Sequence, residues 1–125
     1  MHFGIHSRKN IAAENIMEKT QQIPLHSAPS QFTLGRIVWT RGVNDLIAEN
    51  IGFAKLVITS LKRHARGDWG DLCNEDKTLN DHSINSSLRI FSAYDVSIEG
   101  VDEGRIWIIT EADRSATTVL FPHEY

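Results

Sequence analysis

The sequence contains little cysteine and no long apolar run. Cys73 is the single cysteine in 125 residues, which excludes an intrachain disulfide and a thiolate-rich metal site. No segment approaches the roughly 18 apolar residues of a membrane-spanning helix. The first 30 residues hold no continuous apolar stretch of signal-peptide length. These absences predict a cytoplasmic protein that does not associate with a membrane.

The chain also has no excess of positive charge. It carries 13 lysine and arginine residues against 16 aspartate and glutamate residues, for a formal net charge of −3. A general electrostatic attraction to nucleic acid is therefore not expected, although a local basic face remains compatible with it. With 41% hydrophobic and 23% charged residues, the composition is typical of a globular domain.

Hydrophobic periodicity separates a polar N-terminal appendage, residues 1–30, from a single α+β domain, residues 31–125. The appendage contains one weak helical pattern between Asn10 and Gln22. In the domain, β-branched and aromatic residues predict strands at residues 32–39, 88–98, 105–111 and 117–121. Because the last three are joined by short links, we expect a four-stranded, mainly antiparallel sheet with about three helices packed on one side.

Two of these helices follow the first strand. Apolar residues at three- and four-residue spacing predict short helices that are joined near Gly52. Thr40 is suited to cap the first helix. Gly67 is suited to end the second, which carries basic residues in its last turns.

The third helix is expected to begin at Asn74, acting as its N-cap, and to run to Ser86. Its apolar face is thin, with Leu79 and Ile84. The helix should therefore lie on the surface of the domain.

The densest group of chemically versatile residues lies in the loop at residues 64–76. It combines two glycines with a histidine, a tryptophan and four carboxylates. Loops on a rigid scaffold often carry binding and catalytic groups, so His64, Asp68, Trp69 and Asp71 are candidate site residues. The alternative is structural: Asp68 and Asp71 cap helix ends, and Trp69 anchors the loop in the core.

A metal site at His64, Asp68 and Asp71, joined by Glu75 or Asp76, is a weaker alternative. The segment lacks a second imidazole at helical spacing and lacks the alternating oxygen ligands of a calcium loop. The lone cysteine near the helix start is compatible with a nucleophile, but free cysteine usually behaves as a small hydrophobe. No metal and no cofactor are predicted.

A second polar group, Glu111, Asp113 and Arg114, lies where the chain turns between its last two strands. If Arg114 pairs with a neighbouring carboxylate, the segment is a self-contained hairpin turn. If the turn instead meets the loop that holds Asp68 and Asp71, carboxylates and Arg114 converge on one cleft. Such a cleft suits general acid/base chemistry or a phosphate-bearing ligand.

The second helix carries four basic residues that offer contacts to phosphate or to an acidic partner, namely Lys55, Lys62, Arg63 and Arg66. No aromatic residue interleaves with them, so a platform for base stacking is missing. A solvated helix face is the favoured interpretation.

Several motifs of residues 32–125 resemble one family of small bacterial proteins described as plasmid-related, found on plasmids and integrated elements. They are Gly67–Leu72 (GDWGDL), Glu75–Asp76, Asn80, Ser92–Tyr94, Trp107–Thr118 (WIITEADRSATT), Pro122 and Glu124–Tyr125. The resemblance implies an association with mobile genetic elements and assigns no activity to any residue. A restriction-modification label is sometimes attached to such proteins. This chain has no glycine-rich cofactor loop after a strand that would support it.

The sequence favours a non-enzymatic accessory or interaction protein of mobile genetic elements. It would bind a protein partner through the loop face, the surface formed by the two polar segments at residues 64–76 and 111–115. Polar loops with tryptophan and arginine resemble recognition surfaces, and no complete catalytic constellation is visible. One alternative is a small hydrolase or nuclease-like enzyme that uses carboxylates of both segments, with or without a divalent metal. Another is a DNA-binding regulator that contacts DNA through the second helix.

Overall fold

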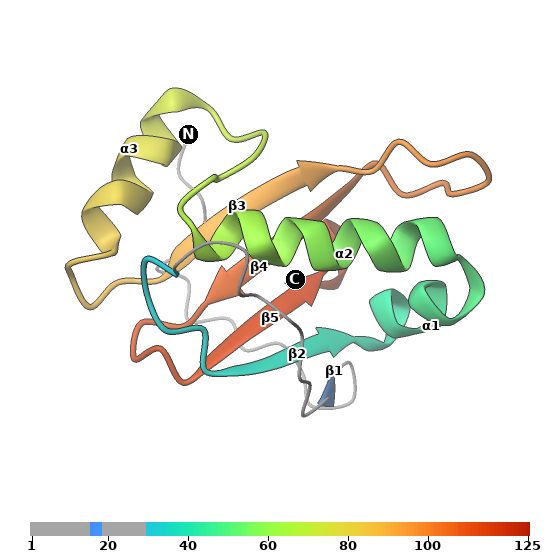
Figure 1. Ribbon diagram of the computed structural model, residues 1–125, viewed down its shortest axis with the longest axis horizontal. Helices are drawn as coiled ribbons and strands as arrows, with labels where there is room; N and C mark the ends of the chain where they lie inside the picture. The colour runs from blue at the N-terminus through green and yellow to red at the C-terminus, as the bar shows by residue number, and fades with distance from the viewer. Residues whose placement is uncertain (1–15, 19–29) are drawn as a thin grey trace.

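The computed structural model describes residues 16–18 and 30–125 (Figure 1). In chain order the elements are β1 (Ile16–Glu18), β2 (Arg36–Thr40), α1 (Arg41–Glu49), α2 (Ile51–Ala65), α3 (Asn74–Ser83), β3 (Ile90–Asp95), β4 (Arg105–Thr110), β5 (Ala116–Leu120) and a short 3-10 helix, η2 (Pro122–Glu124). The predicted α+β class with three helices is confirmed. None of the described helices is both long enough and apolar enough to span a bilayer.

The strands form a mixed sheet in the order β1-β2-β5-β4-β3. The pairs β3–β4 and β4–β5 are antiparallel, as their short connections predict, whereas β2 runs parallel to β5. β1 adds antiparallel to the outer edge of β2. Two parallel neighbouring strands need a crossover connection. Between β2 and β5 the chain passes through α1, α2, α3, β3 and β4.

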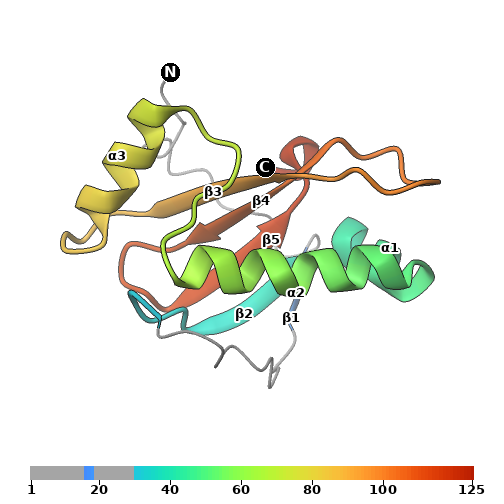
Figure 2. The same ribbon diagram turned by 45° about the horizontal axis from the view of Figure 1, so that its top comes forward.

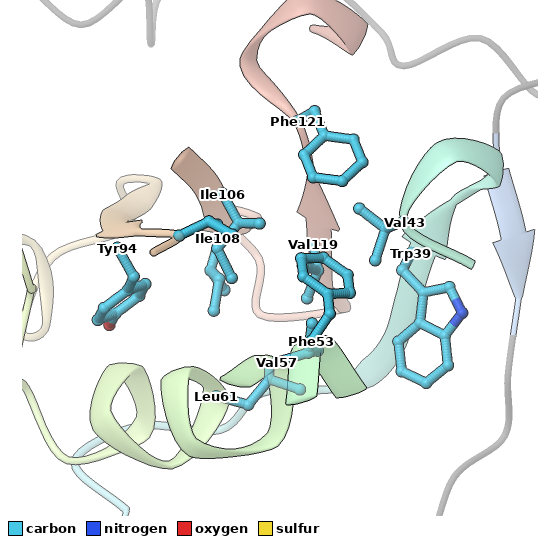
Figure 3. Close-up of a cluster of buried hydrophobic side chains, with 11 residues drawn as sticks. Trp39, Val43, Phe53, Val57, Leu61, Tyr94, Ile106, Ile108, Val119 and Phe121 are labelled. Carbon is cyan, nitrogen blue, oxygen red and sulfur yellow. The ribbon is translucent and has the colours of Figure 1, made fainter. Parts of the chain in front are cut away.

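The hydrophobic core lies between one face of this sheet and the helices α1 and α2. Val57 and Leu61 of α2 face Ile108 and Val119 of the sheet, and all four are buried (Figure 3). Burial of each such side chain contributes about 1.5–3 kcal/mol. The helical stripes that the sequence predicts are therefore the contacts that hold the two layers together.

Thr40 caps α1 as predicted, and Asn50 lies at the junction of α1 and α2. The hydroxyl of Thr40 accepts a hydrogen bond from the Val43 N–H at the start of α1. Asn50 ends α1 and caps α2, because its side chain accepts from the Phe53 N–H at 2.9 Å. One residue thus closes the first helix and opens the second.

Glu124 of η2 joins the C-terminal segment to the start of α1. Its carboxylate accepts hydrogen bonds from the Gly42 N–H at 3.0 Å, from the Phe121 N–H at 2.9 Å and from the Thr40 hydroxyl. This placement sets a negative charge at the positive end of the α1 dipole, which is the favourable end for an acid.

α3 lies alongside β3 at the edge of the sheet, away from α1 (Figures 1 and 2). Its surface location confirms the prediction, and Leu79 is 40% exposed. Its buried residues are polar, Asp76, Asn80 and Ser83. The expected N-cap is wrong by one residue: Cys73 occupies the cap position without a side-chain bond, and Asn74 is the first helical residue.

Two further expectations need correction. β2 begins at Arg36 rather than Phe32, because the residues before it run along the end of α2, where the Gln31 N–H donates to the Ala65 carbonyl. The helical pattern expected between Asn10 and Gln22 is wrong for Ile16–Glu18, which pair with β2 as a strand. The rest of that range lies outside the described residues.

Candidate functional site

The candidate loop begins with a glycine-centred end to α2. Gly67 has a φ of +84°, and its N–H donates to the His64 carbonyl at 3.1 Å. The Asp68 N–H donates to the Arg63 carbonyl at 2.8 Å. These two bonds form a Schellman motif, which favours glycine at the left-handed position. The prediction that Gly67 ends the second helix is confirmed.

The loop then pairs with the edge of β3. The Ala93 N–H donates to the Trp69 carbonyl at 3.4 Å, and the Asp71 N–H donates to the Ala93 carbonyl at 2.7 Å. Gly70 between them has a φ of +73°, and a Cβ there would lie 2.1 Å from the Ala93 carbonyl oxygen. Only glycine permits this approach of two backbones.

Asn80 and Asp71 extend this cover along β3. The Asn80 side chain accepts from the Phe91 N–H at 3.1 Å and donates to the Phe91 carbonyl. The Asp71 carboxylate accepts from the Asp95 N–H at 2.9 Å. Alternate residues of an edge strand direct their N–H and C=O groups outward, so Phe91, Ala93 and Asp95 would otherwise offer a template to another strand. The loop and α3 close this edge.

Asp68 fastens the loop to α2. Its carboxylate accepts two bonds from the Arg63 guanidinium, at 2.8 and 3.1 Å, and one from the Gly70 N–H at 3.2 Å. The hydrogen bond from Arg63 lowers the pKa of Asp68 below its ordinary value. Partial burial acts in the opposite direction, and the hydrogen bond from the Gly70 N–H lowers the pKa further. The Asp68 carbonyl also accepts from the Tyr94 hydroxyl at 2.7 Å. The expected helix-capping role of Asp68 and Asp71 is therefore wrong, because their partners lie in α2, the loop and β3.

Trp69 is the core anchor of the loop, as the structural alternative predicts. It is 3% exposed, and its indole N–H donates to Asp81 at 2.8 Å. Its ring stacks on Phe32 and meets His64 edge-on, with centroids 6.1 and 5.7 Å away. A ring buried in this way gives no surface to a partner.

His64 is fully buried in a chain of hydroxyl groups. Its Nδ1 lies 2.6 Å from Ser92 Oγ and its Nε2 lies 2.8 Å from Thr110 Oγ1. Thr110 Oγ1 lies 2.7 Å from Thr117 Oγ1, and the Thr117 hydroxyl donates to the Leu34 carbonyl at 2.7 Å. This series of hydrogen bonds links α2, the strands β3, β4 and β5, and the segment before β2.

The direction of the hydrogen bonds in this series determines which ring nitrogen of His64 carries the proton. Because the Thr117 hydroxyl donates to a carbonyl, the Thr110 hydroxyl must donate to Thr117 and accept from His64. Nε2 therefore carries the proton, and Nδ1 accepts from Ser92. Burial lowers the pKa of His64 to about 3, so the ring is neutral near pH 7. Both ring nitrogens are in use, which leaves neither for a metal ion or for Cys73.

The segment at residues 111–115 forms a hairpin turn, but the prediction that this turn is self-contained is wrong, because the side chains of Glu111 and Arg114 bind other segments. The Arg114 N–H donates to the Glu111 carbonyl at 2.8 Å, and the Asp113 carboxylate accepts from the Ser115 N–H at 3.0 Å. Hydrogen bonds from Ser115 lower the pKa of Asp113. The Glu111 carboxylate accepts from Arg89 at 3.1 Å, so the salt bridge expected within the turn is made with another segment.

Arg114 binds backbone carbonyls instead of a carboxylate. It donates at 2.7 to 3.1 Å to the carbonyls of Ser83, Ser86, Leu88, Glu111 and Ala112. The first three follow or end α3, where carbonyl groups carry partial negative charge. Burial lowers the pKa of Arg114, although an arginine remains charged. Its guanidinium ties the turn to the C-terminal end of α3.

Phe32 contacts both groups of candidate residues. Its ring stacks on Trp69 and lies 6.0 Å from the Arg114 guanidinium carbon. The loop and the turn are thus joined through Phe32 and α3, while the carboxylates of four candidate residues are each bound to separate neighbours: Asp68, Asp71, Glu111 and Asp113. Within residues 16–18 and 30–125, no three Asp, Glu, His or Cys side chains are placed to hold a metal ion.

A pocket that sequence reasoning missed lies between α1, the β3–β4 loop and the C-terminal segment, with a volume of about 260 Å³. We name it the acidic pocket, after the carboxylates that line it, Asp45, Glu49, Asp102 and Glu103. Two sequence signals were available: a pair of acids at four-residue spacing on a predicted helix, and an acid-rich turn near residue 102. Only the fold brings these two segments together.

Comparison with known proteins assigns no relative to the chain. No protein-family model, no curated protein and no solved structure matches it. What the protein does must be inferred from its own residues and their geometry.

Proposed function

We propose that this chain is a non-catalytic interaction protein that binds a protein partner through the loop face together with the adjoining surface of α3 and of residues 84–89. The supporting observation is a rigid surface with exposed apolar groups. α3 is held by Asn80 on β3 and by Arg114 at its end, while Leu79 and Leu88 are 40% and 46% exposed. A surface that is already ordered loses little entropy on binding.

The same contacts argue against catalysis at the loop face. A general acid or base needs a polar atom that reaches the substrate. The ring nitrogens of His64 are bound inside the core, and the Asp68 carboxylate holds Arg63. These groups stabilise the fold and are not poised for proton transfer.

The proposal includes an accessory role in mobile genetic elements, which rests on the resemblance of two motifs. In the fold, GDWGDL is the edge-covering loop at residues 67–72, and WIITEADRSATT covers most of β4, the turn and part of β5. Each motif contains residues of one of the two polar segments that form the loop face. A partner encoded by the same kind of element is the natural occupant.

Affinity capture with matched surface variants tests the proposal. The wild-type chain, Leu79→Asp, Leu88→Asp and the control Ile58→Asp, on the exposed side of α2, are compared in extract from a host that carries such an element. A partner should be retained by the wild type and the control and be lost with Leu79→Asp and Leu88→Asp, which change the surface that adjoins the loop face. With the purified partner, calorimetry should give at least about a tenfold weaker Kd for each of these two variants, which corresponds to about 1.4 kcal/mol.

Two results would contradict this function. Proteins captured equally by all four chains would show that the loop face is not the binding surface. Saturable binding of magnesium, manganese or zinc that is lost in Asp68→Asn or Asp71→Asn would favour a metal-dependent enzyme instead.

A further inference from the structure

The face of the sheet opposite α1 and α2, here called the rear face, is also apolar and buried. Successive side chains of a strand point to opposite faces. On β4, Ile108 therefore packs in the core with α2, while Ile109 packs in a separate cluster with Phe91 of β3 and Leu120 of β5. Phe91, Ile109 and Leu120 are at most 3% exposed, although α1 and α2 lie on the other side of the sheet (Figures 1 and 2).

This burial continues across the rear face to β2. The strand register pairs Phe91 with Ile109, Ile109 with Thr118, and Thr118 with Val38, and paired side chains share a face. Thr118 and Val38 are 4% and 5% exposed. A row of four buried side chains thus crosses β3, β4, β5 and β2.

Leu72 and Tyr125, from outside the strands, pack on the rear-face cluster. Both lie toward β3 and β4, since Leu72 follows the loop residue Asp71 that binds β3, and Tyr125 meets Trp107 of β4 edge-on at 5.8 Å. Val38 lies two strands beyond β4, on β2. Its burial calls for a cover that reaches the other side of the sheet.

Strand β1 brings the N-terminal segment to the edge of the rear face. Glu18 of β1 is the register partner of Val38, so residues 1–15 start from the outer edge of β2. Residues 19–29 join β1 to a different place, because Gln31 donates to the Ala65 carbonyl at the end of α2. Residues 1–15 are therefore the part of the chain best placed to cross the rear face.

Residues 1–15 are long enough to cross the whole sheet. An extended segment of this length spans up to about 50 Å. The four strand spacings from β1 to β3 amount to about 19 Å. The segment can reach Phe91 with length to spare.

The sequence of this segment suits an apolar surface. Met1, Phe3 and Ile5 alternate with histidines and a glycine, which is the two-residue period of an extended chain with one apolar side. An extended conformation would place the three apolar side chains on one side. That side matches the apolar surface of the rear face.

We propose that residues 1–15 lie across the rear face of the sheet in the same chain, with Phe3 and Ile5 packed on the cluster of Phe91, Ile109 and Leu120. The segment then forms a third layer of the domain rather than an appendage. It also closes an apolar sheet face to other proteins, because a contiguous apolar surface left open is a site of association. This inference does not depend on binding at the loop face.

Photo-crosslinking of the full chain tests where the segment lies. Phe3→p-benzoylphenylalanine places a photoreactive ring at the proposed contact, and Ile58→p-benzoylphenylalanine, at an exposed position of α2, is the control. Trypsin separates the relevant segments, because cleavage after Arg and Lys releases residues 1–8, 106–114 and 115–125 as distinct fragments. Mass spectrometry then identifies the linked fragments and the linked residue.

Light should join residues 1–8 to 106–114 or 115–125 within one chain, at Trp107, Ile109 or Leu120. The Ile58 control should give no link to these two fragments. A link to residues 56–62 of α2, or no link above the level of the control, would overturn the inference. Links between two chains would identify a second copy as the occupant and would also overturn it.

A fluorescence measurement tests whether the segment closes the rear face. Phe3→Asp/Ile5→Asp should expose apolar surface and raise the fluorescence of the dye ANS severalfold. The control His2→Asp/His6→Asp changes two alternate positions of the same segment and should leave the fluorescence at the wild-type level. Near-UV circular dichroism reports whether each variant is folded. Equal fluorescence of the two folded variants would show that Phe3 and Ile5 do not cover the sheet.

Discussion

At the scale of single residues, His64 shows why a polar side chain occupies the centre of this fold. A neutral imidazole provides one donor and one acceptor, and the two hydroxyls beside it, Ser92 and Thr110, need one of each. An apolar residue at position 64 would leave buried hydroxyl groups unpaired, at about 1–3 kcal/mol each. His64 is explained by these bonds and needs no catalytic role.

Acid should destabilise the protein through His64. The ordinary pKa of histidine is 6.5, and burial lowers that of folded His64 to about 3, so between these values the unfolded chain binds more protons than the folded chain. The contribution is complete above pH 6.5 and is lost as the pH falls toward 3, by up to about 1.4 kcal/mol per pH unit. Urea unfolding at a series of pH values measures it.

The variant His64→Gln is the control for this pH dependence. Glutamine retains a donor and an acceptor but does not titrate. It should remove the part of the slope that His64 adds, while the slope due to carboxylates remains. An unchanged slope in His64→Gln would contradict the assignment.

Gly70 and Gly100 form a matched pair for testing the contact between the loop and β3. Both have a positive φ, 73° and 84°. A Cβ at Gly100 would meet nothing within 4 Å, whereas one at Gly70 would lie 2.1 Å from a backbone oxygen. Gly100→Ala should cost about 1–2 kcal/mol from backbone conformation alone. Gly70→Ala should cost at least about 2 kcal/mol more, because the loop must leave the strand. Equal costs in denaturant unfolding would show that the two backbones are not in contact.

At the scale of elements, regular apolar spacing makes α1, α2, β4 and β5 predictable from sequence to within about two residues. Their apolar residues face one core, so the period of the pattern reports the geometry of the backbone. α3 differs because its buried face is polar. A pattern that treats polar residues as exposed cannot identify that face. The strand Ile16–Glu18 is too short for a period to be recognised.

The sequence predicts where the candidate site lies, but it does not predict which residues its side chains contact. The composition of residues 64–76 marks an unusual loop, but the partners of its side chains lie elsewhere in the chain. Asp71 binds a residue 24 positions away, and Arg114 binds one 31 positions away. A local sequence pattern does not predict contacts between residues that are this far apart in the chain. The structural alternative, with a helix end at Gly67 and a buried Trp69, describes the loop better than a catalytic cleft does.

Asn80 tests whether α3 covers the edge of β3. Asn80→Ala removes both partners of the Phe91 backbone, so a buried N–H and a buried C=O lose their bonds. The free energy of unfolding should fall by about 2–4 kcal/mol, the cost of two unsatisfied buried groups. The exposed Asn85, just beyond α3, provides the control Asn85→Ala, which should change stability by less than about 0.5 kcal/mol. Similar values for the two variants would show that α3 is not bound to the strand.

At the scale of the whole molecule, the sheet carries different structures at its two ends. One end holds α3 and the loop, which close the edge of β3, and the other holds the acidic pocket between α1 and the β3–β4 loop. The polar residues that look most like an active site in the sequence therefore hold the fold together. The surface proposed for binding a partner lies at the first end, where Leu79 and Leu88 are exposed.

Amide hydrogen exchange at Phe91 and Ala93 tests most directly the central claim that loop 64–76 and α3 form a rigid cover over β3. Both amides point away from β4. Among the described residues, the Asn80 side chain accepts from the Phe91 N–H and the Trp69 carbonyl accepts from the Ala93 N–H. They should exchange as slowly as the amide of Ile108 in the interior of the sheet, and Asn80→Ala should accelerate Phe91 selectively. If both amides of the wild-type protein exchange as fast as that of the exposed Glu99, the cover is open in solution and the account is contradicted.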